Sequence, residues 1–185
     1  MEINRRMRSR YQQSKVSGEV SSLMGVRKSL PAWKERTRIV DLLKSHQVVV
    51  ISGMTGCGKS TQVPQFILDN WLAGDSRAEH CSVVCTQPRR ISAIGVAGRV
   101  AQERGEKPGD VVGYQIRLET KASERTRLMF CTTGILLRRL EGDPSLGDIT
   151  HVIVDEVHER SEESDLHLMI KNCPYARIKE RNTGG

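Results

Sequence analysis

The segment Gly53-Met-Thr-Gly-Cys-Gly-Lys-Ser60 has the residue types and spacing of a phosphate-binding loop. It matches the pattern G-x-x-x-x-G-K-[ST], in which glycines let successive backbone N–H groups turn toward phosphate oxygens. A helix that begins near Lys59 would direct the positive end of its dipole at the same anion. Lys59 would reach the β- and γ-phosphates, and the Ser60 hydroxyl would bind Mg²⁺. The strand and helix expected on either side disfavour an ordinary glycine-rich turn.

A second, acidic element follows in His151-Val-Ile-Val-Asp155-Glu156, and it supplies the oxygen ligands that Mg²⁺ prefers. The apolar run predicts a strand that delivers Asp155 to the carboxyl edge of a sheet, where doubly wound folds bind ligands. We expect Asp155 to hold Mg²⁺, directly or through water, and Glu156 to polarise the attacking water. An Asp-Glu pair after an apolar strand is common by itself, and it gains meaning from the phosphate loop about 95 residues upstream.

The elements that must position these residues follow from the hydrophobic pattern. Apolar runs predict strands of a parallel sheet at residues 48–51, 82–86, 127–131 and 151–155. Helices are expected at residues 33–44, 59–73, 90–104 and 134–140, with a smaller extended piece at 111–117. The alternation of strand and helix predicts an α/β fold with helices on both faces of the sheet.

Length and charge set the broad class of protein. The chain has 185 residues, of which 37% are hydrophobic and 28% charged, which indicates a folded chain of about one domain. Residues 1–38 contain ten Lys and Arg and three acidic residues, so they account for the whole net charge of +7. We expect residues 1–30 to form a flexible basic arm, which either binds nucleic-acid phosphates or is a solvated tail.

The five cysteines show no paired spacing that would indicate a disulfide framework. His80, Cys81 and Cys85 could suggest zinc, but residues 81–85 favour a strand and no second ligand pair follows. No secretory segment follows Met1, and the apolar runs are far shorter than the ~20 residues that span a bilayer. We expect a soluble intracellular protein, cytoplasmic or nuclear, with reduced thiols and no membrane contact.

With these motifs in order, the chain resembles the DEAH/DExH-box RNA helicases of superfamily 2. The phosphate loop with Thr61-Gln-Val-Pro-Gln-Phe66 looks like their motif I, and Asp155-Glu-Val-His158 looks like their motif II. Thr86-Gln-Pro-Arg-Arg90 resembles motif Ia, and Thr132-Thr-Gly-Ile-Leu-Leu-Arg138 resembles motif Ib. The likeness covers roughly residues 28–170.

The resemblance implies a RecA-like P-loop NTPase fold, with residues 31–170 as a partial ATP-binding domain. It implies ATP and Mg²⁺ as cofactors and RNA, contacted through its backbone, as a partner. Glu156 would act as the base or water-orienting residue with Lys59, and His158 would link the nucleotide site to the RNA surface. The implied nucleotide-binding residues are Gly53, Thr55, Gly56, Cys57, Gly58, Lys59, Ser60, Thr61 and Arg99, the last of which would stack on adenine. The implied Mg²⁺ ligands are Ser60, Asp155 and Glu156, and the implied RNA-binding residues are Thr86, Arg89, Arg90 and Thr132.

The sequence departs from this family after motif II. No Ser-Ala-Thr motif III follows Arg160, residues 171–185 form a divergent tail, and no second RecA-like domain with its arginine fingers follows. The family's motif III strand lies between the P-loop strand and the Asp-Glu strand. Its loss would leave backbone groups unpaired, each at a cost of about 1–3 kcal/mol. A finger is worth roughly 10³–10⁵ in rate, so we expect an incomplete sheet, no unwinding by this chain alone and little ATP hydrolysis.

Three functions stay open at this point, and with them the question of whether the chain alone is an enzyme. The first is the ATP-binding N-terminal part of a DExH-box RNA helicase. The second is a non-catalytic short isoform that binds RNA or a protein partner. The third is another P-loop ATPase, such as a nucleotide kinase, which the Asp-Glu-Val-His and Thr-Gln-Pro-Arg-Arg segments disfavour.

Overall fold

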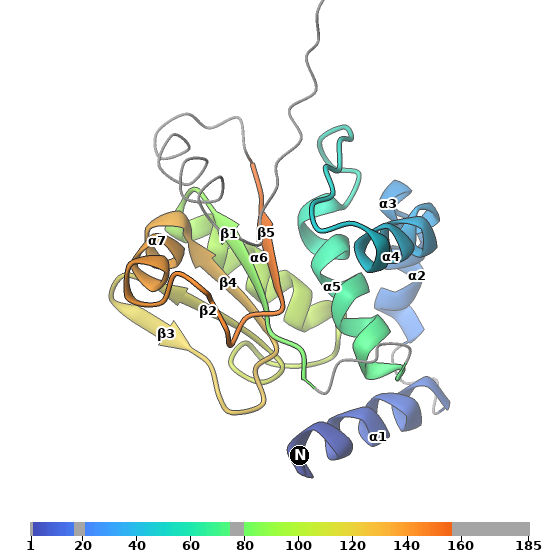
Figure 1. Ribbon diagram of the computed structural model, residues 1–185. Helices are drawn as coiled ribbons and strands as arrows, with labels where there is room; N and C mark the ends of the chain where they lie inside the picture. The colour runs from blue at the N-terminus through green and yellow to red at the C-terminus, as the bar shows by residue number, and fades with distance from the viewer. Residues whose placement is uncertain (1, 17–20, 75–79, 157–185) are drawn as a thin grey trace, which may run out of the picture.

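A five-stranded sheet forms the centre of the protein in the computed structural model, which describes residues 2–16, 21–74 and 80–156 (Figure 1). The strand order is β3-β2-β4-β1-β5. The strands are β1 (Val83–Gln87), β2 (Val112–Ile116), β3 (Glu119–Lys121), β4 (Leu128–Thr132) and β5 (His151–Val154). Neighbouring strands are parallel except for β2 and β3, which form an antiparallel pair. Apart from β3, each strand lies within one residue of a segment for which the sequence predicts extended structure.

Helices cover both faces of this sheet, which confirms the predicted α/β class. The helices are α1 (Glu2–Val16), α2 (Ser21–Ser29), α3 (Pro31–Lys34), α4 (Arg36–Ser45), α5 (Lys59–Leu72), α6 (Arg90–Glu103) and α7 (Thr133–Gly142). The single helix expected at residues 33–44 is divided at Glu35 into α3 and α4. Within the described ranges, no helix combines the length and the apolar character needed to cross a membrane.

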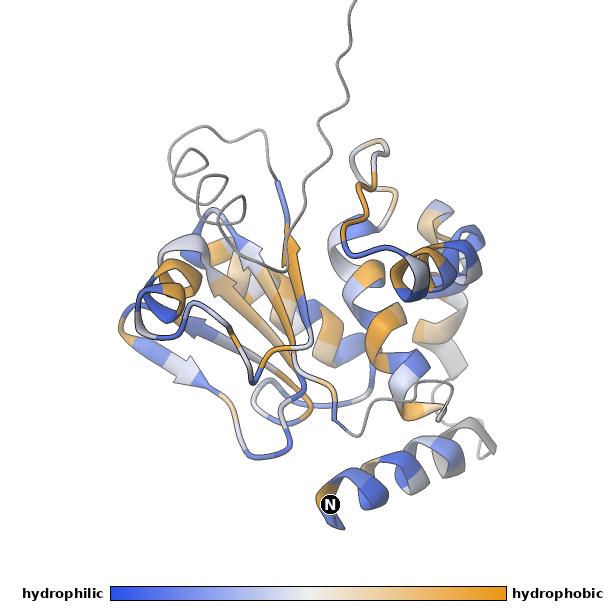
Figure 2. Ribbon diagram, viewed as in Figure 1, coloured by the Kyte–Doolittle hydropathy of each residue, from blue (hydrophilic) through white to orange (hydrophobic). Residues whose placement is uncertain are grey.

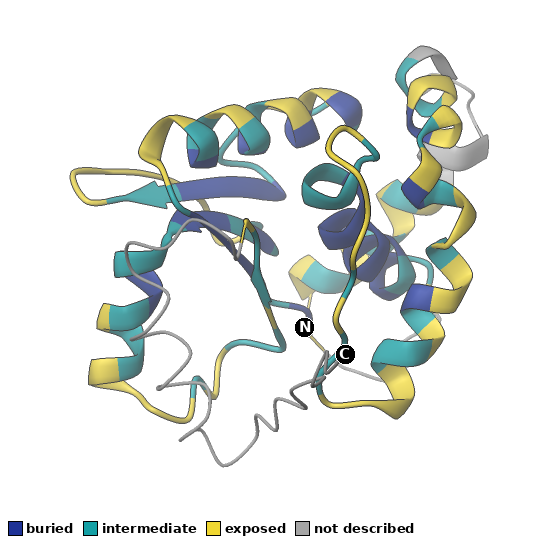
Figure 3. Cartoon of the chain, turned by 90° about the horizontal axis from the view of Figure 1, so that it is seen from above, coloured by how far each residue is buried: buried dark blue, intermediate teal, exposed yellow. Residues whose placement is uncertain are grey.

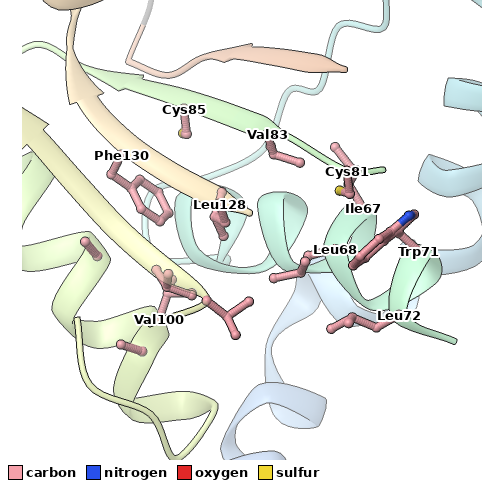
Figure 4. Close-up of a cluster of buried hydrophobic side chains, with 14 of the residues drawn as sticks. Ile67, Leu68, Trp71, Leu72, Cys81, Val83, Cys85, Val100, Leu128 and Phe130 are labelled. Carbon is pink, nitrogen blue, oxygen red and sulfur yellow. The ribbon is translucent and has the colours of Figure 1, made fainter. Parts of the chain in front are cut away.

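The core follows from the two-residue period of the strands. Val83, Cys85 and Phe130 face α5 and α6 in the larger buried cluster, which Figure 4 shows in close-up. Val84 and Cys131 point to the opposite face and pack with α7. The central strands β1 and β4 therefore carry apolar residues on both faces, seen as orange ribbon in Figure 2, and they are largely buried between helices whose outer faces are exposed (Figure 3).

The strand expected at residues 48–51 is not present, and this prediction was wrong. The segment has no regular secondary structure, Val50 is 81% exposed, and Ile51 packs against a separate cluster with Ile39 and Phe66. β-Branched residues favour a strand, but a strand also needs a neighbour for its backbone hydrogen bonds. The described residues provide none here, and β5 forms the edge of the sheet, which is incomplete on this side as expected.

Residues 1–30, expected as a flexible arm, instead carry α1 and α2, which pack on the domain. Met7 is 6% exposed in the main core, and Tyr11, four residues later, packs against the same cluster. The Arg8 guanidinium lies 4.7 Å from the centroid of the Trp71 ring, and Arg27 of α2 is 2% exposed. The high content of arginine predicts a solvated segment, whereas a few apolar residues at helical spacing are enough to pack α1 on the domain. This is the physical reason for the difference.

Candidate nucleotide-binding site

The phosphate loop leads directly into α5, which begins at Lys59 as expected. Gly56 and Gly58 have φ angles of +79° and +95°, left-handed values that glycine adopts without steric cost. A Cβ on Gly58 would also come within 3.0 Å of Leu30 Cδ1. The Ala32 N–H donates to the Cys57 carbonyl oxygen at 3.0 Å. The loop is therefore shaped by its own glycines and braced from outside by residues 30–32.

The Lys59 ammonium lies inside this loop. Its Nζ donates to the carbonyl oxygens of Gly53, at 2.5 Å, and Met54, at 3.0 Å, and lies 3.6 Å from Cys57 Sγ. A phosphate oxygen is a stronger acceptor for an ammonium group than a neutral carbonyl. The loop thus holds a cation at the point where the motif requires one. Of the other expected loop residues, Thr55 is exposed and the Thr61 hydroxyl donates to the Gly58 carbonyl oxygen at 3.4 Å.

Asp155 and Glu156 follow β5 at the carboxyl edge of the sheet, as the sequence predicts. The Asp155 carboxylate accepts a hydrogen bond from Gln87 Nε2 at 2.7 Å and another from the Glu156 backbone N–H at 3.0 Å. Gln87, the last residue of β1, is only 3% exposed, so its amide is a fixed donor. Glu156 has a φ of +55°, a left-handed value that costs a residue with a Cβ about 1–3 kcal/mol.

One cavity joins the phosphate-loop helix to this acidic edge. It has a volume of about 440 Å³ and is lined by Ser60, Gln87, Pro88, Arg89, Ser92, Gly95, Val96 and Glu156. The fold therefore brings together Ser60 and Glu156, which are far apart in the sequence. Both carry oxygen donors, and Asp155 lies next to Glu156, so the donor set suits Mg²⁺. No group of three or more His, Cys, Asp or Glu side chains suited to a metal occurs in the described part of the chain.

Arg99 lies on α6, outside the loop, and is held by a buried carboxylate. Its Nε donates to Glu103 Oε1 at 2.8 Å, and its side chain is 43% exposed whereas that of Glu103 is 1% exposed. The other oxygen of Glu103 accepts hydrogen bonds from Gln62 Nε2 at 2.9 Å and from Gln65 Nε2 at 2.8 Å. Both glutamines belong to α5, so Arg99 is tied to the helix that follows the phosphate loop.

Asp69 forms the second half of this buried polar region. It accepts hydrogen bonds from the guanidinium groups of Arg27, at 2.9 Å, and Arg104, at 2.7 Å. Burial alone would raise the pKa of Asp69, but the two guanidinium groups lower it below its ordinary value. Arg27 also donates to the Gln62 side-chain oxygen at 2.9 Å. The helix α2 is thus joined by hydrogen bonds to the phosphate-loop helix.

The residues expected to contact RNA gather near the carboxyl ends of β1 and β4. Thr132 is the register partner of Gln87, and Arg89 and Arg90 are exposed at the start of α6. Thr86 is 1% exposed and its hydroxyl lies 3.5 Å from the Ile153 carbonyl oxygen, so this side chain is enclosed in the sheet. His158 lies outside the described residues.

Two structural partners are missing from the sequence-based site. The sequence pattern places Gln87 in the motif Ia segment and predicts no role for it, although a polar residue at the end of an apolar strand is a signal for an edge site. Glu103 follows Arg99 by four residues, which is the spacing of a helical ion pair.

The described cysteines, Cys57, Cys81, Cys85 and Cys131, are free thiols. Burial raises the pKa of Cys131 to about 12 and that of Cys81 to about 11.

Comparison with known proteins gives a consistent set of matches. The sequence pattern described as DEAD/DEAH box helicase matches residues 34–182. Human DHX57 is 58% identical over 167 residues, which is 90% of this chain and 12% of that protein. The DExH-box ATP-dependent RNA helicase DExH1 of Arabidopsis thaliana is 50% identical over 164 residues, 89% of this chain and 16% of the relative. Human ATP-dependent RNA helicase DHX29 is 48% identical over 169 residues, which is 89% of this chain and 12% of that protein. The chain therefore spans less than a fifth of the length of these relatives.

Proposed function

The chain belongs to the DEAD/DEAH box helicase family, and from that premise we propose that it is the nucleotide-binding part of an ATP-dependent RNA helicase. One observation carries the proposal. Ser60, at the start of the phosphate-loop helix, and Glu156, which follows β5, line the same cavity. In the sequence, Asp155, the neighbour of Glu156, comes 95 residues after Ser60. The cavity therefore lies between the serine of a phosphate-binding loop and the glutamate of an acidic pair, and phosphoryl transfer from a nucleoside triphosphate requires both of these motifs.

In this proposal the backbone N–H groups of the loop, with Lys59, bind the phosphates. Ser60, Asp155 and Glu156 would hold Mg²⁺, which neutralises phosphate charge when bound. Glu156, which lines the same cavity as Ser60, orients the attacking water. The Gln87 amide and the Glu156 N–H fix the Asp155 carboxylate without neutralising its charge, so it stays attractive to a cation. His158 keeps its proposed role of linking the nucleotide and RNA sites.

The RNA contact is proposed to lie at Arg89, Arg90 and Thr132. Thr86, whose side chain is buried, would contribute by positioning the segment that leads to Arg89 and Arg90. Exposed arginines at the start of a helix suit phosphate groups and do not read base sequence. We assign RNA unwinding only to proteins of the length of the relatives, of which this chain covers less than a fifth.

The proposed RNA contact is tested by measuring the binding of a fluorescent single-stranded RNA homopolymer, which Arg90→Ala should weaken. An exchange of two exposed arginines of α1, Arg5→Glu with Arg10→Glu, serves as the control. A larger loss in the α1 variant would favour binding of RNA through the N-terminal helices instead.

The central experiment measures thermal unfolding of the 185-residue chain with and without Mg²⁺ and a non-hydrolysable ATP analogue. At one hundred times the dissociation constant, a bound ligand stabilises the folded state by about 2.7 kcal/mol. We expect this stabilisation in the wild type and its loss in Lys59→Ala. Lys44→Ala, an exposed lysine of α4 outside the loop, is the matched control and should retain it. Equal stabilisation of the Lys59→Ala variant would contradict the proposed site.

A further inference from the structure

A buried polar cluster lies between α2, α5 and α6, and the proposed reaction does not use it. Its members are Arg27, Gln62, Gln65, Asp69, Glu103 and Arg104, and the side chain of each is 5% exposed or less. Arg99, at 43%, is the exposed side chain attached to it. Buried charges are expensive to hold unless every one is paired, so a cluster of this kind calls for an explanation.

Glu103 is the centre of one half of this cluster. Its Oε2 accepts two amide hydrogen bonds, from Gln62 and Gln65, and lies 4.0 Å from Arg27 Nε. Its Oε1 accepts the hydrogen bond from Arg99 Nε. Gln62 lies in the first turn of α5, directly after the phosphate loop, and Gly58 packs against its side chain. The carboxylate therefore connects the phosphate loop to an arginine on a different helix.

This arrangement restricts the Arg99 side chain. A free arginine has many rotamers, and it loses this rotamer entropy when it is fixed against a ligand. Here Nε is already bound to a carboxylate that is itself held by two glutamines. The rest of the guanidinium group belongs to a side chain that is nearly half exposed. An arginine anchored in this way is pre-organised to present its planar face to a ligand.

We propose that Glu103 is a positioning residue for nucleobase recognition, fixing the Arg99 guanidinium so that it stacks on the base of a triphosphate held by the phosphate loop. Arg27 and the two glutamines hold Glu103 in place, so α2 contributes to the site without touching the nucleotide. A planar stack does not read the edges of a base, and the contact therefore tolerates more than one base. This inference rests on the proposed nucleotide-binding function.

A purely structural role for Glu103 predicts something different. If the carboxylate only holds α5 against α6, its loss distorts the phosphate loop and weakens every ligand of that loop equally. If it positions Arg99, its loss weakens a triphosphate that carries a base and spares one that does not. Inorganic tripolyphosphate and ATP differ in this respect, so the ratio of their affinities separates the two roles.

The experiment measures by calorimetry the binding of ATP and of inorganic tripolyphosphate, each with Mg²⁺, to the 185-residue chain. We expect Arg99→Ala and Glu103→Gln each to lower the preference for ATP over tripolyphosphate about fivefold, the size of a modest cation–π contact. The double variant should lose no more than either single one, because the two residues act through one contact. Gln102→Ala, an exposed neighbour on the same helix, is the matched control and should keep the wild-type preference.

Four results would overturn the inference. An equal loss of both ligands in Glu103→Gln would assign a structural role to this carboxylate. An unchanged preference in Arg99→Ala would remove the base contact altogether. Absence of any Lys59-dependent binding of either ligand would overturn the proposed function itself, and the inference with it. Glu103→Asp keeps the charge and shortens the side chain, so it covers the case in which Glu103→Gln does not fold. We expect it to lower the preference for ATP as well, and an unchanged preference would contradict the inference.

Discussion

Asp69 and Asp155 are held by opposite kinds of partner. Asp69, on the phosphate-loop helix, is 2% exposed and accepts hydrogen bonds from two guanidinium groups. Asp155, at the edge of the sheet, accepts hydrogen bonds from a side-chain amide and a backbone N–H, and no cation lies within ion-pair distance of it in the described residues. One carboxylate is neutralised inside the protein, whereas the other is oriented but keeps its charge.

This difference separates a structural carboxylate from one that is available to a ligand. A buried charge paired with cations joins helices and has no capacity left for a metal ion. A carboxylate oriented by neutral donors keeps its negative charge, and its fixed direction reduces the entropy lost on binding a cation. The hydrogen-bond partners of Asp69 and Asp155, and not the residue type, therefore distinguish the buried cluster from the edge of the sheet. Variants of each region should accordingly differ in whether they change stability or ligand binding.

The largest expected effect is on folding, in Asp69→Asn. This change leaves the guanidinium groups of Arg27 and Arg104 buried without their carboxylate, and breaking such a pair costs about 3–5 kcal/mol. Urea unfolding followed by circular dichroism measures the loss in free energy of unfolding. Asp41→Asn removes an exposed ion pair with Lys44 and is the control, for which we expect little change. A loss below about 1 kcal/mol in Asp69→Asn would mean that the buried pairs are replaceable by water.

A smaller effect, on binding instead of folding, is expected for Asp155→Asn. The amide keeps the shape of the side chain and removes the charge that should attract Mg²⁺. We expect the affinity for Mg²⁺ with the ATP analogue to fall about tenfold, or ~1.4 kcal/mol, with little change in stability. Titration of Mg²⁺ into the chain with a fluorescent ATP analogue measures this. A variant that loses stability but keeps its Mg²⁺ dependence would reverse the assignment of the two aspartates.

Replacement of Gln87 by leucine tests whether orientation of Asp155 matters separately from its charge. The substitution keeps an apolar body of similar size but removes the amide donor that lies 2.7 Å from the carboxylate. We expect a loss of stability of about 1 kcal/mol and a weaker Mg²⁺ affinity than in the wild type, because second-sphere donors orient metal ligands. Gln102→Leu on the exposed face of α6 is the control. An unchanged Mg²⁺ affinity would show that Asp155 needs no fixed donor.

The sequence predicts the parts of this molecule that depend on local pattern. The apolar runs of β1, β4 and β5 identify their strands, and the glycines of the phosphate loop identify its position before α5. The segment at residues 48–51 has an equally strong local pattern but forms no strand, because pairing depends on a neighbour that the segment itself does not encode. The location of the loop was therefore predictable, whereas the way in which it is supported was not.

The two aspartates show the same limit for the site. Asp155 follows a motif and could be named from the sequence, but its partner Gln87 lies 68 residues away. Arg27 belongs to a segment whose charge predicts a solvated arm, yet its side chain is buried against Asp69. Burial of a single arginine depends on tertiary contacts from α5 and α6, and no local window of the sequence contains them. Only the Arg99–Glu103 pair has a local signal, the four-residue spacing on one helix.

The smallest expected effects are two steps in the dependence of stability on pH, one from each region. Burial lowers the pKa of His151, on β5, below its ordinary 6.5, so the unfolded chain binds a proton more readily. Stability therefore falls as the pH drops below about 6.5 toward the folded pKa. The pKa of Asp69 is also lowered, from 3.8, and its contribution is lost only as the pH falls below that value. Both steps lower stability on acidification, but in separate windows.

Urea midpoints measured between pH 7.5 and 3 should resolve these windows. In His151→Gln, which cannot titrate, the decline that begins near the ordinary pKa of 6.5 should be smaller, and the decline at lower pH should persist. The Asp69→Asn variant should be less stable than the wild type at neutral pH, and its stability should fall less as the pH drops below 3.8. Glu106 acts in the opposite direction, because burial raises its pKa and favours its protonated form in the folded state. If the His151→Gln variant keeps the full decline near neutral pH, a group other than this histidine must take up the proton, and the edge strand is then not the acid-sensitive part of the sheet.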